Sequence, residues 1–181
     1  MPARVVTVAA VATVVVLALV KFWGIDEPRW VEAGLGATLS VCVACAVVDV
    51  SDGRIPDRLV LASIVPTLLV LVARASSGDL RVAGTAVLLG IVLFAGPLFV
   101  MHLAVPDALG FGDVKLAVSL GAVIGTVEWR YAVAALCIAS GLTAATALVR
   151  RRSAMPLAPG LVTGAALVVL LPTLEGSVPW R

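Results

Sequence analysis

The sequence predicts an all-α protein, a polytopic membrane bundle of about seven transmembrane helices. Of its 181 residues, 61% are hydrophobic and only 13% are charged, whereas an ordinary soluble domain is about 25% charged. A chain this short cannot hide so much apolar surface in one water-soluble core. Long apolar runs also alternate with short charged loops along the whole chain, which is the pattern of helices that cross a bilayer.

The same composition excludes several other classes of protein: a soluble enzyme, a nucleic-acid-binding domain and a disordered tail. The net charge is +2, from 13 Lys and Arg against 11 Asp and Glu, which is too small to indicate a nucleic-acid partner. The three cysteines, Cys42, Cys45 and Cys137, lie in apolar runs, so we expect them to be buried and to pack as small hydrophobic side chains. Cys42 and Cys45 form a C-x-x-C without a second pair or histidine partners, and no metal site is predicted.

Seven apolar runs define the expected helices, and charged residues, glycines or prolines separate them. They cover residues 5–20, 33–48, 59–73, 82–103, 114–127, 131–149 and 157–171. The first run could belong to a signal peptide, but Lys21-Phe22-Trp23 makes a poor cleavage site. We therefore expect residues 1–32 to form a retained transmembrane helix with a short loop, and residues 33–181 to form the core.

Two of these runs contain pairs of glycines at a spacing that suits helix packing. Gly121 and Gly125 form a G-x-x-x-G in the fifth run, and Gly160 and Gly164 form another in the seventh. In lipid, such pairs let two helices approach closely. A packing or interfacial role is expected for His102, the single histidine, near the end of the fourth run.

The basic residues of the loops set the expected orientation. The side that holds the N-terminus carries seven Lys or Arg residues and the other side carries six. The cluster Arg150–Arg152 adds weight to placing the N-terminus in the cytoplasm. The loops at 49–58 and 104–115 then face the cytoplasm as well.

Carboxylates gather on this predicted cytoplasmic side. They are Asp49, Asp52, Asp57, Asp107 and Asp113. Asp49 directly follows the second run and Asp113 opens the fifth, and acids in such places are costly and usually functional. Two carboxylates brought together can share one proton, so that the ionised one acts as a base on water while the protonated one polarises a carbonyl. This is the chemistry of an aspartic protease, and it needs no metal and no cofactor.

The string Gly110-Phe111-Gly112-Asp113 suits such a site. We expect the two glycines to adopt backbone conformations closed to other residues and to let a substrate peptide approach closely. Asp113 at a helix N-terminus would have its ionised form favoured by the helix dipole. The alternative is that Asp113 only caps the helix.

Three strings together resemble the signatures of the type IV prepilin peptidases, which are GxGD-type intramembrane aspartic proteases. Asp49 is followed seven residues later by Pro56, within an Ile-Pro-Asp turn. Residues 110–116 resemble a G-x-G-D-x-K-L signature, and residues 156–160 are similar to a third, looser string. The resemblance covers residues 33–174, and the offset to Pro56 is what selects Asp49 over Asp52 or Asp57.

The resemblance implies an endopeptidase of the bacterial inner (plasma) membrane whose active site faces the cytoplasm. It would remove the short basic leader from type IV prepilins or pilin-like secretion proteins, after a Gly, with the lipid bilayer as its surroundings and without a metal or cofactor. The positions that match are Asp49 and Asp113 for the catalytic aspartates and Gly110, Gly112, Lys115 and Pro56 for the supporting motif. The sequence indicates no oligomeric state.

One departure from the family changes the expected activity. Many members carry an N-terminal insertion with two C-x-x-C pairs, which is associated with N-methylation of the mature pilin. The loop at 21–32 is too short for it, and Cys42 and Cys45 lie in an expected helix. We therefore expect cleavage without methylation. Asp57 stands where the family often has Asn, which is compatible with a turn, and the roles of Asp52 and Asp57 stay open.

Two alternatives come from different classes of protein. One is a proton- or ion-coupled transporter with Asp49 and Asp113 as relay groups, although the sequence shows no internal repeat. The other is a non-enzymatic membrane subunit in which the acids pair with Arg54 and Lys115.

Overall fold

The computed structural model describes residues 29–52, 55, 57–77, 80–106, 109–150 and 156–174, and these form an all-helical bundle. Its helices are α2 (Arg29–Asp52), α3 (Asp57–Ser77), α4 (Leu80–Ala104), α5 (Phe111–Glu128), α6 (Tyr131–Arg150) and α7 (Ala158–Leu174). Each of them corresponds to one predicted run. The predicted helix over 5–20 lies outside the described residues.

Two of the described helices are long and apolar enough to cross a membrane, over Arg81–Ala104 and Tyr131–Val149. Shorter apolar helices cover Gly34–Val50 and Ala158–Val169. α5 has 18 residues but includes an aspartate, a lysine and a glutamate. The all-α class is therefore confirmed for the described part of the chain, whereas the count of seven spans stays a prediction.

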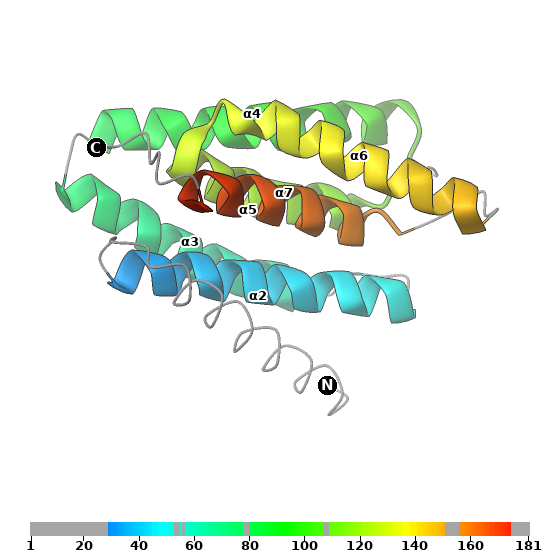
Figure 1. Ribbon diagram of the computed structural model, residues 1–181, viewed down its shortest axis with the longest axis horizontal. Coiled ribbons are helices and arrows are strands. Elements are labelled where there is room, and N and C mark those ends of the chain that lie inside the picture. Colours follow the sequence, from blue (N-terminus) through cyan, green and yellow to red (C-terminus); the bar gives the residue numbers. More distant parts are fainter. Residues whose placement is uncertain are drawn as a thin grey trace.

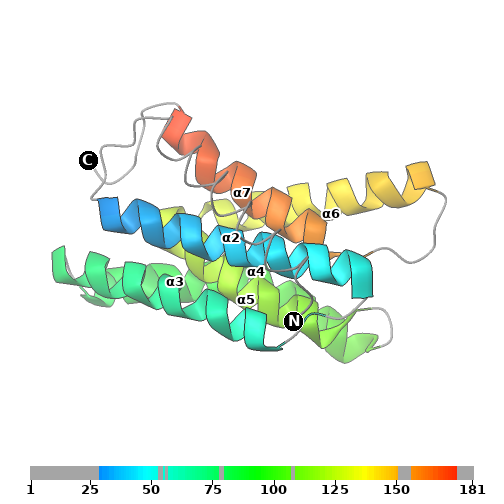
Figure 2. The same ribbon diagram turned by 90° about the horizontal axis from the view of Figure 1, so that it is seen from below.

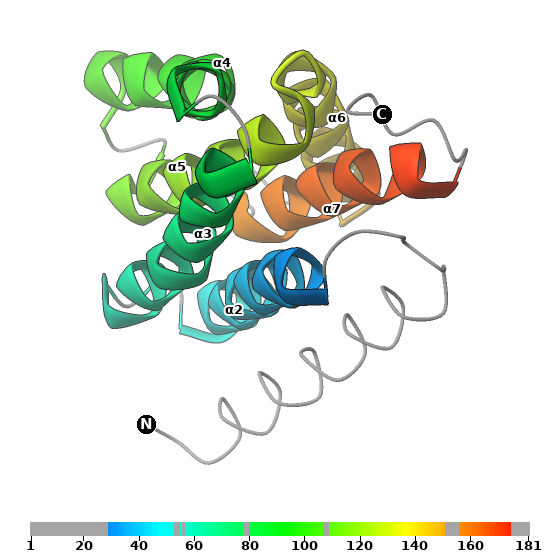
Figure 3. The same cartoon turned by 90° about the vertical axis from the view of Figure 1, so that its left-hand side faces the viewer.

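The helices lie side by side along the longest axis of the molecule, in three layers of two (Figure 1). α4 and α6 form one outer layer, α5 and α7 the middle, and α2 and α3 the other outer layer, which faces the viewer in Figure 2. The end-on view in Figure 3 shows the same order. α5 contacts each of the other described helices, and its side chains from Ser119 to Val127 are all buried.

Glycines allow the middle layer to pack closely against the helices above it. A methyl group on Gly125 would come within 2.6 Å of the Cα of Val87 in α4, and one on Gly164 would come within 2.9 Å of the amide nitrogen of Ala139 in α6. Because no L side chain fits there, the helix backbones are in direct contact. The predicted role of the G-x-x-x-G pairs in helix packing is confirmed.

Hydroxyl groups join helices inside the bundle. Ser63 of α3 donates a hydrogen bond to Ser119 of α5 at 2.8 Å, and the hydroxyls of Thr38 in α2 and Thr67 in α3 lie 3.2 Å apart. Each pairing satisfies polar atoms that burial would otherwise leave without a partner.

The cysteines divide into two groups. Cys42 and Cys45 are buried in the core, as predicted. The prediction was wrong for Cys137, which is exposed. It lies on α6, an outer helix whose side chains mostly face outward, and an apolar residue in a membrane helix can face lipid as well as protein.

Candidate active site

The ends of α2, α4 and α6 meet the starts of α3, α5 and α7 at one end of the bundle (right-hand end of Figure 1). Asp49 lies in the last turn of α2 and Asp113 in the first turn of α5, and these two helices are in contact. The two carboxylates are close enough for the charge of Asp49 to act on Asp113. The fold therefore brings together the pair selected from the sequence, across 64 residues of chain.

The first turn of α5 differs from the expectation in two respects. Gly110 is the N-cap residue, with φ −65° and ψ 139° and no side-chain capping bond, and its carbonyl accepts a hydrogen bond from the N–H of Asp113 at 3.1 Å. The alternative that Asp113 caps the helix is therefore wrong, since Gly110 is the N-cap residue and no side-chain hydrogen bond caps this end of α5. The expectation of unusual backbone angles is also wrong, because these angles at Gly110 are ordinary extended backbone.

Gly112 packs closely against the segment that precedes α3. A methyl group on Gly112 would lie 3.2 Å from the Cβ of Ile55, which is in the connection between α2 and α3. The missing side chain lets this connection pack against the first turn of α5. Ile55 follows α2, which carries Asp49, and Gly112 directly precedes Asp113, so this close contact lies beside both aspartates.

Both carboxylates are partly buried, and each has an oxygen without a hydrogen-bond partner among the described residues, Asp49 Oδ2 and Asp113 Oδ1. Burial, and secondly the charge of Asp49, raise the pKa of Asp113 to about 6. Burial also raises the pKa of Asp49, against the opposing effect of a hydrogen bond from the N–H of Ala158. Asp49 lies one residue before the end of the apolar helix Gly34–Val50 and Asp113 lies in the first turn of α5, so both are at the ends of their apolar segments.

Ala158 is a residue that sequence reasoning did not select. It begins α7, so its N–H is one of the helix N-terminal donors that have no partner within the helix. The loose signature over 156–160 contained the signal, because it placed a proline-flanked helix start after the last basic cluster. A third helix thus contributes a main-chain donor to the aspartate pair.

The family of this chain follows from a comparison with known families. The family model of the type IV leader peptidases matches residues 36–148, which include both aspartates and most of the bundle. The chain belongs to the type IV leader peptidase family. No curated protein and no solved structure matches it.

The family establishes the class of activity. The chain is a protease, a hydrolase with the apolar helices of a membrane protein, and its family implies pilin-like precursors as substrates. Among the three classes considered for the sequence, family membership favours the peptidase over the transporter and over the non-enzymatic subunit.

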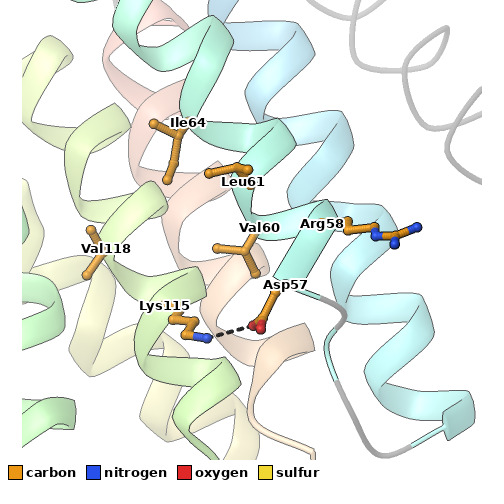
Figure 4. Close-up of a pocket in the computed structure, with 7 residues that line it drawn as sticks. All are labelled: Asp57, Arg58, Val60, Leu61, Ile64, Lys115 and Val118. Carbon is orange, nitrogen blue, oxygen red and sulfur yellow. Dashed lines mark hydrogen bonds and ion pairs between the residues drawn. The ribbon is translucent and has the colours of Figure 1, made fainter.

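Lys115 of the peptidase pairs with an unexpected partner. Its Nζ donates a hydrogen bond to Asp57 Oδ1 at 2.6 Å, as Figure 4 shows. The bond joins the first turn of α5 to the first residue of α3. Asp57 is therefore both exposed to solvent and ion-paired, which gives a role to an acid whose function the sequence left open.

A groove of about 420 Å³ lies beside this ion pair, between α3 and α5 (Figure 4). Its lining includes Asp57 and Lys115 at one end and apolar side chains along the rest, among them Leu61, Ile64 and Val118. Residues two apart on a helix point to different sides, so the face of α5 that carries Lys115 is turned away from Asp113. The groove is therefore separate from the aspartate pair.

The remaining candidates fall partly outside the described residues. Pro56, Arg54 and Asp107 are not among them, and for Asp52 the structure gives only its place at the end of α2. The predicted supporting role of Pro56 stays a prediction. His102 has a local role, because its Nδ1 lies 2.8 Å from the carbonyl oxygen of Leu109.

Proposed function

We propose that the chain is an intramembrane aspartic endopeptidase in which Asp49 and Asp113 form the catalytic pair. The observation that carries the proposal is the meeting of two partly buried carboxylates at the ends of α2 and α5, each with an unpartnered oxygen and close enough for the charge of Asp49 to act on Asp113. Buried carboxylates without partners destabilise a fold, and their presence is explained if they bind a water molecule and a peptide carbonyl.

The surroundings of the two aspartates suggest different roles. Burial raises the pKa of Asp49, but a hydrogen bond from the N–H of Ala158 opposes this rise and favours the ionised form of Asp49 over that of Asp113, which has no such opposing cause. Asp113 is buried and feels the negative charge of Asp49, which favours its protonated form. Asp49 is therefore assigned as the general base, and Asp113 as the acid that donates a hydrogen bond to the scissile carbonyl.

Hydrolysis then proceeds in two steps. Asp49 takes a proton from water while the hydroxide oxygen bonds to the carbonyl carbon, and Asp113 gives its proton to the carbonyl oxygen, which leaves a neutral tetrahedral gem-diol. Asp113 next accepts a proton from one diol hydroxyl while Asp49 gives its proton to the amide nitrogen. The C–N bond breaks, and a carboxylic acid and an amine leave.

The finer features of the reaction follow the family resemblance and the charge pattern. The proposed substrate is a prepilin or pilin-like precursor, cut after a Gly at the end of its basic leader, on the cytoplasmic side. The chain is proposed to leave the new N-terminus unmethylated, because the loop at 21–32 is too short for the C-x-x-C insertion.

Co-expression with a pilin-like precursor tests the proposal. Wild-type protein is expected to shorten the precursor on a gel, and mass spectrometry of the mature product gives both the cut position and the methylation state of the N-terminus. Asp49→Asn and Asp113→Asn each remove one carboxylate with little change of shape, and each is expected to abolish cleavage, by at least about 10⁴-fold in rate.

Asp52→Asn is the matched control, since it changes the same residue type in the same turn of α2, and it is expected to keep most of the activity. Cleavage by Asp49→Asn or by Asp113→Asn would show that the pair is assigned wrongly. Absence of cleavage by the wild type with any pilin-like precursor would contradict the proposed substrate class.

A further inference from the structure

An ion pair connects two helices beside the aspartate pair. Lys115 Nζ lies 2.6 Å from Asp57 Oδ1, with exposed side-chain fractions of 36% and 78%. Within the described residues, the other ion pair joins Arg130 to Glu128 at 3.9 Å, and these two residues are only two positions apart in the sequence. Of these two ion pairs, the Asp57–Lys115 pair is therefore the one that joins two separate helices, and it lies at the end of the bundle that carries Asp49 and Asp113.

The link continues through an aromatic side chain. The Lys115 ammonium lies 5.0 Å from the ring centroid of Phe111, the first residue of α5, and this ring lies 5.4 Å from that of His102 at the end of α4. A cation over an aromatic face is attracted to it. Asp57, Lys115 and Phe111, which we call the corner clamp, therefore connect the start of α3 to the whole first turn of α5.

Asp113 lies within the turn that the clamp holds. Phe111 and Lys115 are one helical turn apart, and Asp113 is between them. On the other side, Asp57 follows the short connection from Asp49, and Ile55 in that connection packs against Gly112. One ionic contact and one apolar contact thus attach the segment after Asp49 to the turn that carries Asp113.

We propose that Asp57 and Lys115 are positioning residues, whose ion pair fixes the connection between α2 and α3 against the first turn of α5 and so sets the separation of Asp49 and Asp113. This inference rests on the proposed function of those two aspartates. Neither member of the pair touches the reacting atoms.

A role in overall stability fits the observations less well. Exposed ion pairs contribute little to the free energy of unfolding, and the helices are already held by buried side chains and direct glycine contacts. Geometry at an active site is far more sensitive, because a displacement of about 1 Å can cost about 100-fold in rate. Loss of the pair is therefore expected to leave a folded protein with slow catalysis.

Two variants with opposite changes of charge separate positioning from electrostatics. Asp57→Asn removes a negative charge and Lys115→Gln removes a positive one, so their direct effects on the titration of Asp113 have opposite signs. If the corner clamp loosens, however, the pKa of Asp113 falls in both variants, because a greater distance from Asp49 and the entry of water each lower it. The charged or titratable groups at this end of the described bundle are Asp49, Asp52, Asp57, Arg58, His102, Asp113, Lys115 and Arg150.

The measurement is the pH dependence of kcat for leader removal. Both variants are expected to lose about 10- to 100-fold in kcat and to shift the alkaline limb of the profile toward lower pH. The charge-swapped double variant D57K/K115D is expected to recover much of the rate. The matched control is Glu128→Gln with Arg130→Gln, which breaks the ion pair at the other end of α5 and is expected to change neither quantity.

Three outcomes would overturn the inference. If the alkaline limb of the pH profile shifts in opposite directions in Asp57→Asn and Lys115→Gln, the two residues act through charge alone. If the rate falls only in proportion to the folded fraction and the pH profile does not shift, the pair has a purely structural role. If kcat is unchanged, the pair has no role in catalysis.

Failure of the proposed function is distinguishable, since the wild type would then not cleave the precursor. In that case the positioning role of Asp57 and Lys115 is tested without an activity assay, by measuring with mass spectrometry how carbodiimide labelling of Asp113 depends on pH. A shift of this labelling profile toward lower pH in both variants supports the role, and any other pattern overturns it.

Discussion

Asp113 makes the folded state sensitive to pH. Its pKa rises from 3.8 to about 6, mainly through burial and secondly through the charge of Asp49. Because its pKa is raised, Asp113 binds more protons in the folded protein than in the unfolded chain between these two pH values. Its contribution to the free energy of unfolding is therefore fully present below about pH 4 and is lost as the pH rises through about 6.

Asp113→Asn is therefore expected to raise the thermal midpoint at pH 7.5, because the amide has no charge to bury. The shift would be about 2–4 °C for each kcal/mol gained. Thermal unfolding in detergent at pH 4 and at pH 7.5 measures it, and the difference from wild type is expected to vanish at pH 4. If Asp113→Asn is instead less stable than wild type at pH 7.5, the ionised carboxylate of Asp113 is stabilised by interaction partners and is not destabilised by burial.

At the level of single residues, the sequence identified the aspartates but not their neighbours. Asp49 was selected by its offset to Pro56 and Asp113 by the G-x-G-D string, and the fold places the two close enough for the charge of Asp49 to act on Asp113. The hydrogen bond from Ala158 and the pairing of Lys115 with Asp57 could not be predicted, because they depend on how helices distant in sequence are arranged. The reason for Gly112 was also misjudged, since space against Ile55 can be seen only in three dimensions.

At the level of helices, the glycines of α5 invite a direct test. A methyl group on Gly125 would come within 2.6 Å of backbone atoms of α4, whereas nothing lies within 4 Å of one on Gly84 of α4. Gly125→Ala is expected to destabilise the bundle by about 1–3 kcal/mol, as overpacking does. Gly84→Ala, the matched control, is expected to be neutral or slightly stabilising because alanine favours helix.

Thermal unfolding of the two variants in the same detergent measures the difference. Equal stability of Gly125→Ala and Gly84→Ala would mean that α4 and α5 are further apart than the contact requires. A reduced rate of leader removal in Gly125→Ala is a further consequence, since α5 carries Asp113.

The helices themselves were largely predictable, because apolar runs bounded by charges identify membrane helices without knowledge of their neighbours. All six described helices overlap a predicted run. α2 was predicted over 33–48 and extends over Arg29–Asp52, so the helix continues past Asp49 into the polar loop. The burial of Cys137 was predicted wrongly because a membrane helix has apolar residues on its lipid face as well as its protein face.

At the scale of the whole molecule, the arrangement places Asp113, one of the two proposed catalytic aspartates, at one end of a central helix. α5 contacts every other described helix, so its first turn is held from several sides, and Asp113 within it is partly buried. The connection from Asp49 to α3 and the start of α7 meet at the same end. Under the proposed function, this end of the bundle is the one that would meet the junction between a basic leader and an apolar helix.

The orientation of this end in the membrane is open to measurement. Arg58 lies at the end of the bundle that carries Asp49 and Asp113, Arg130 follows the opposite end of α5, and both are exposed. An α5 of 18 residues is about 27 Å long, close to the thickness of the hydrocarbon core. We expect Arg58→Cys to face the cytoplasm and Arg130→Cys to face outward, each made in a background in which Cys137→Ser removes the exposed native thiol.

A membrane-impermeant maleimide added to spheroplasts is expected to label Arg130→Cys at once and Arg58→Cys only after permeabilisation. Labelling of both sites in permeabilised cells controls for thiol reactivity, and the buried Cys42 and Cys45 are expected to stay unlabelled. The reverse pattern would place the aspartates on the outer face, where a cytoplasmic leader could not reach them. Because the loop charges differ by only one residue between the two sides, this labelling decides an orientation that the sequence alone favours weakly.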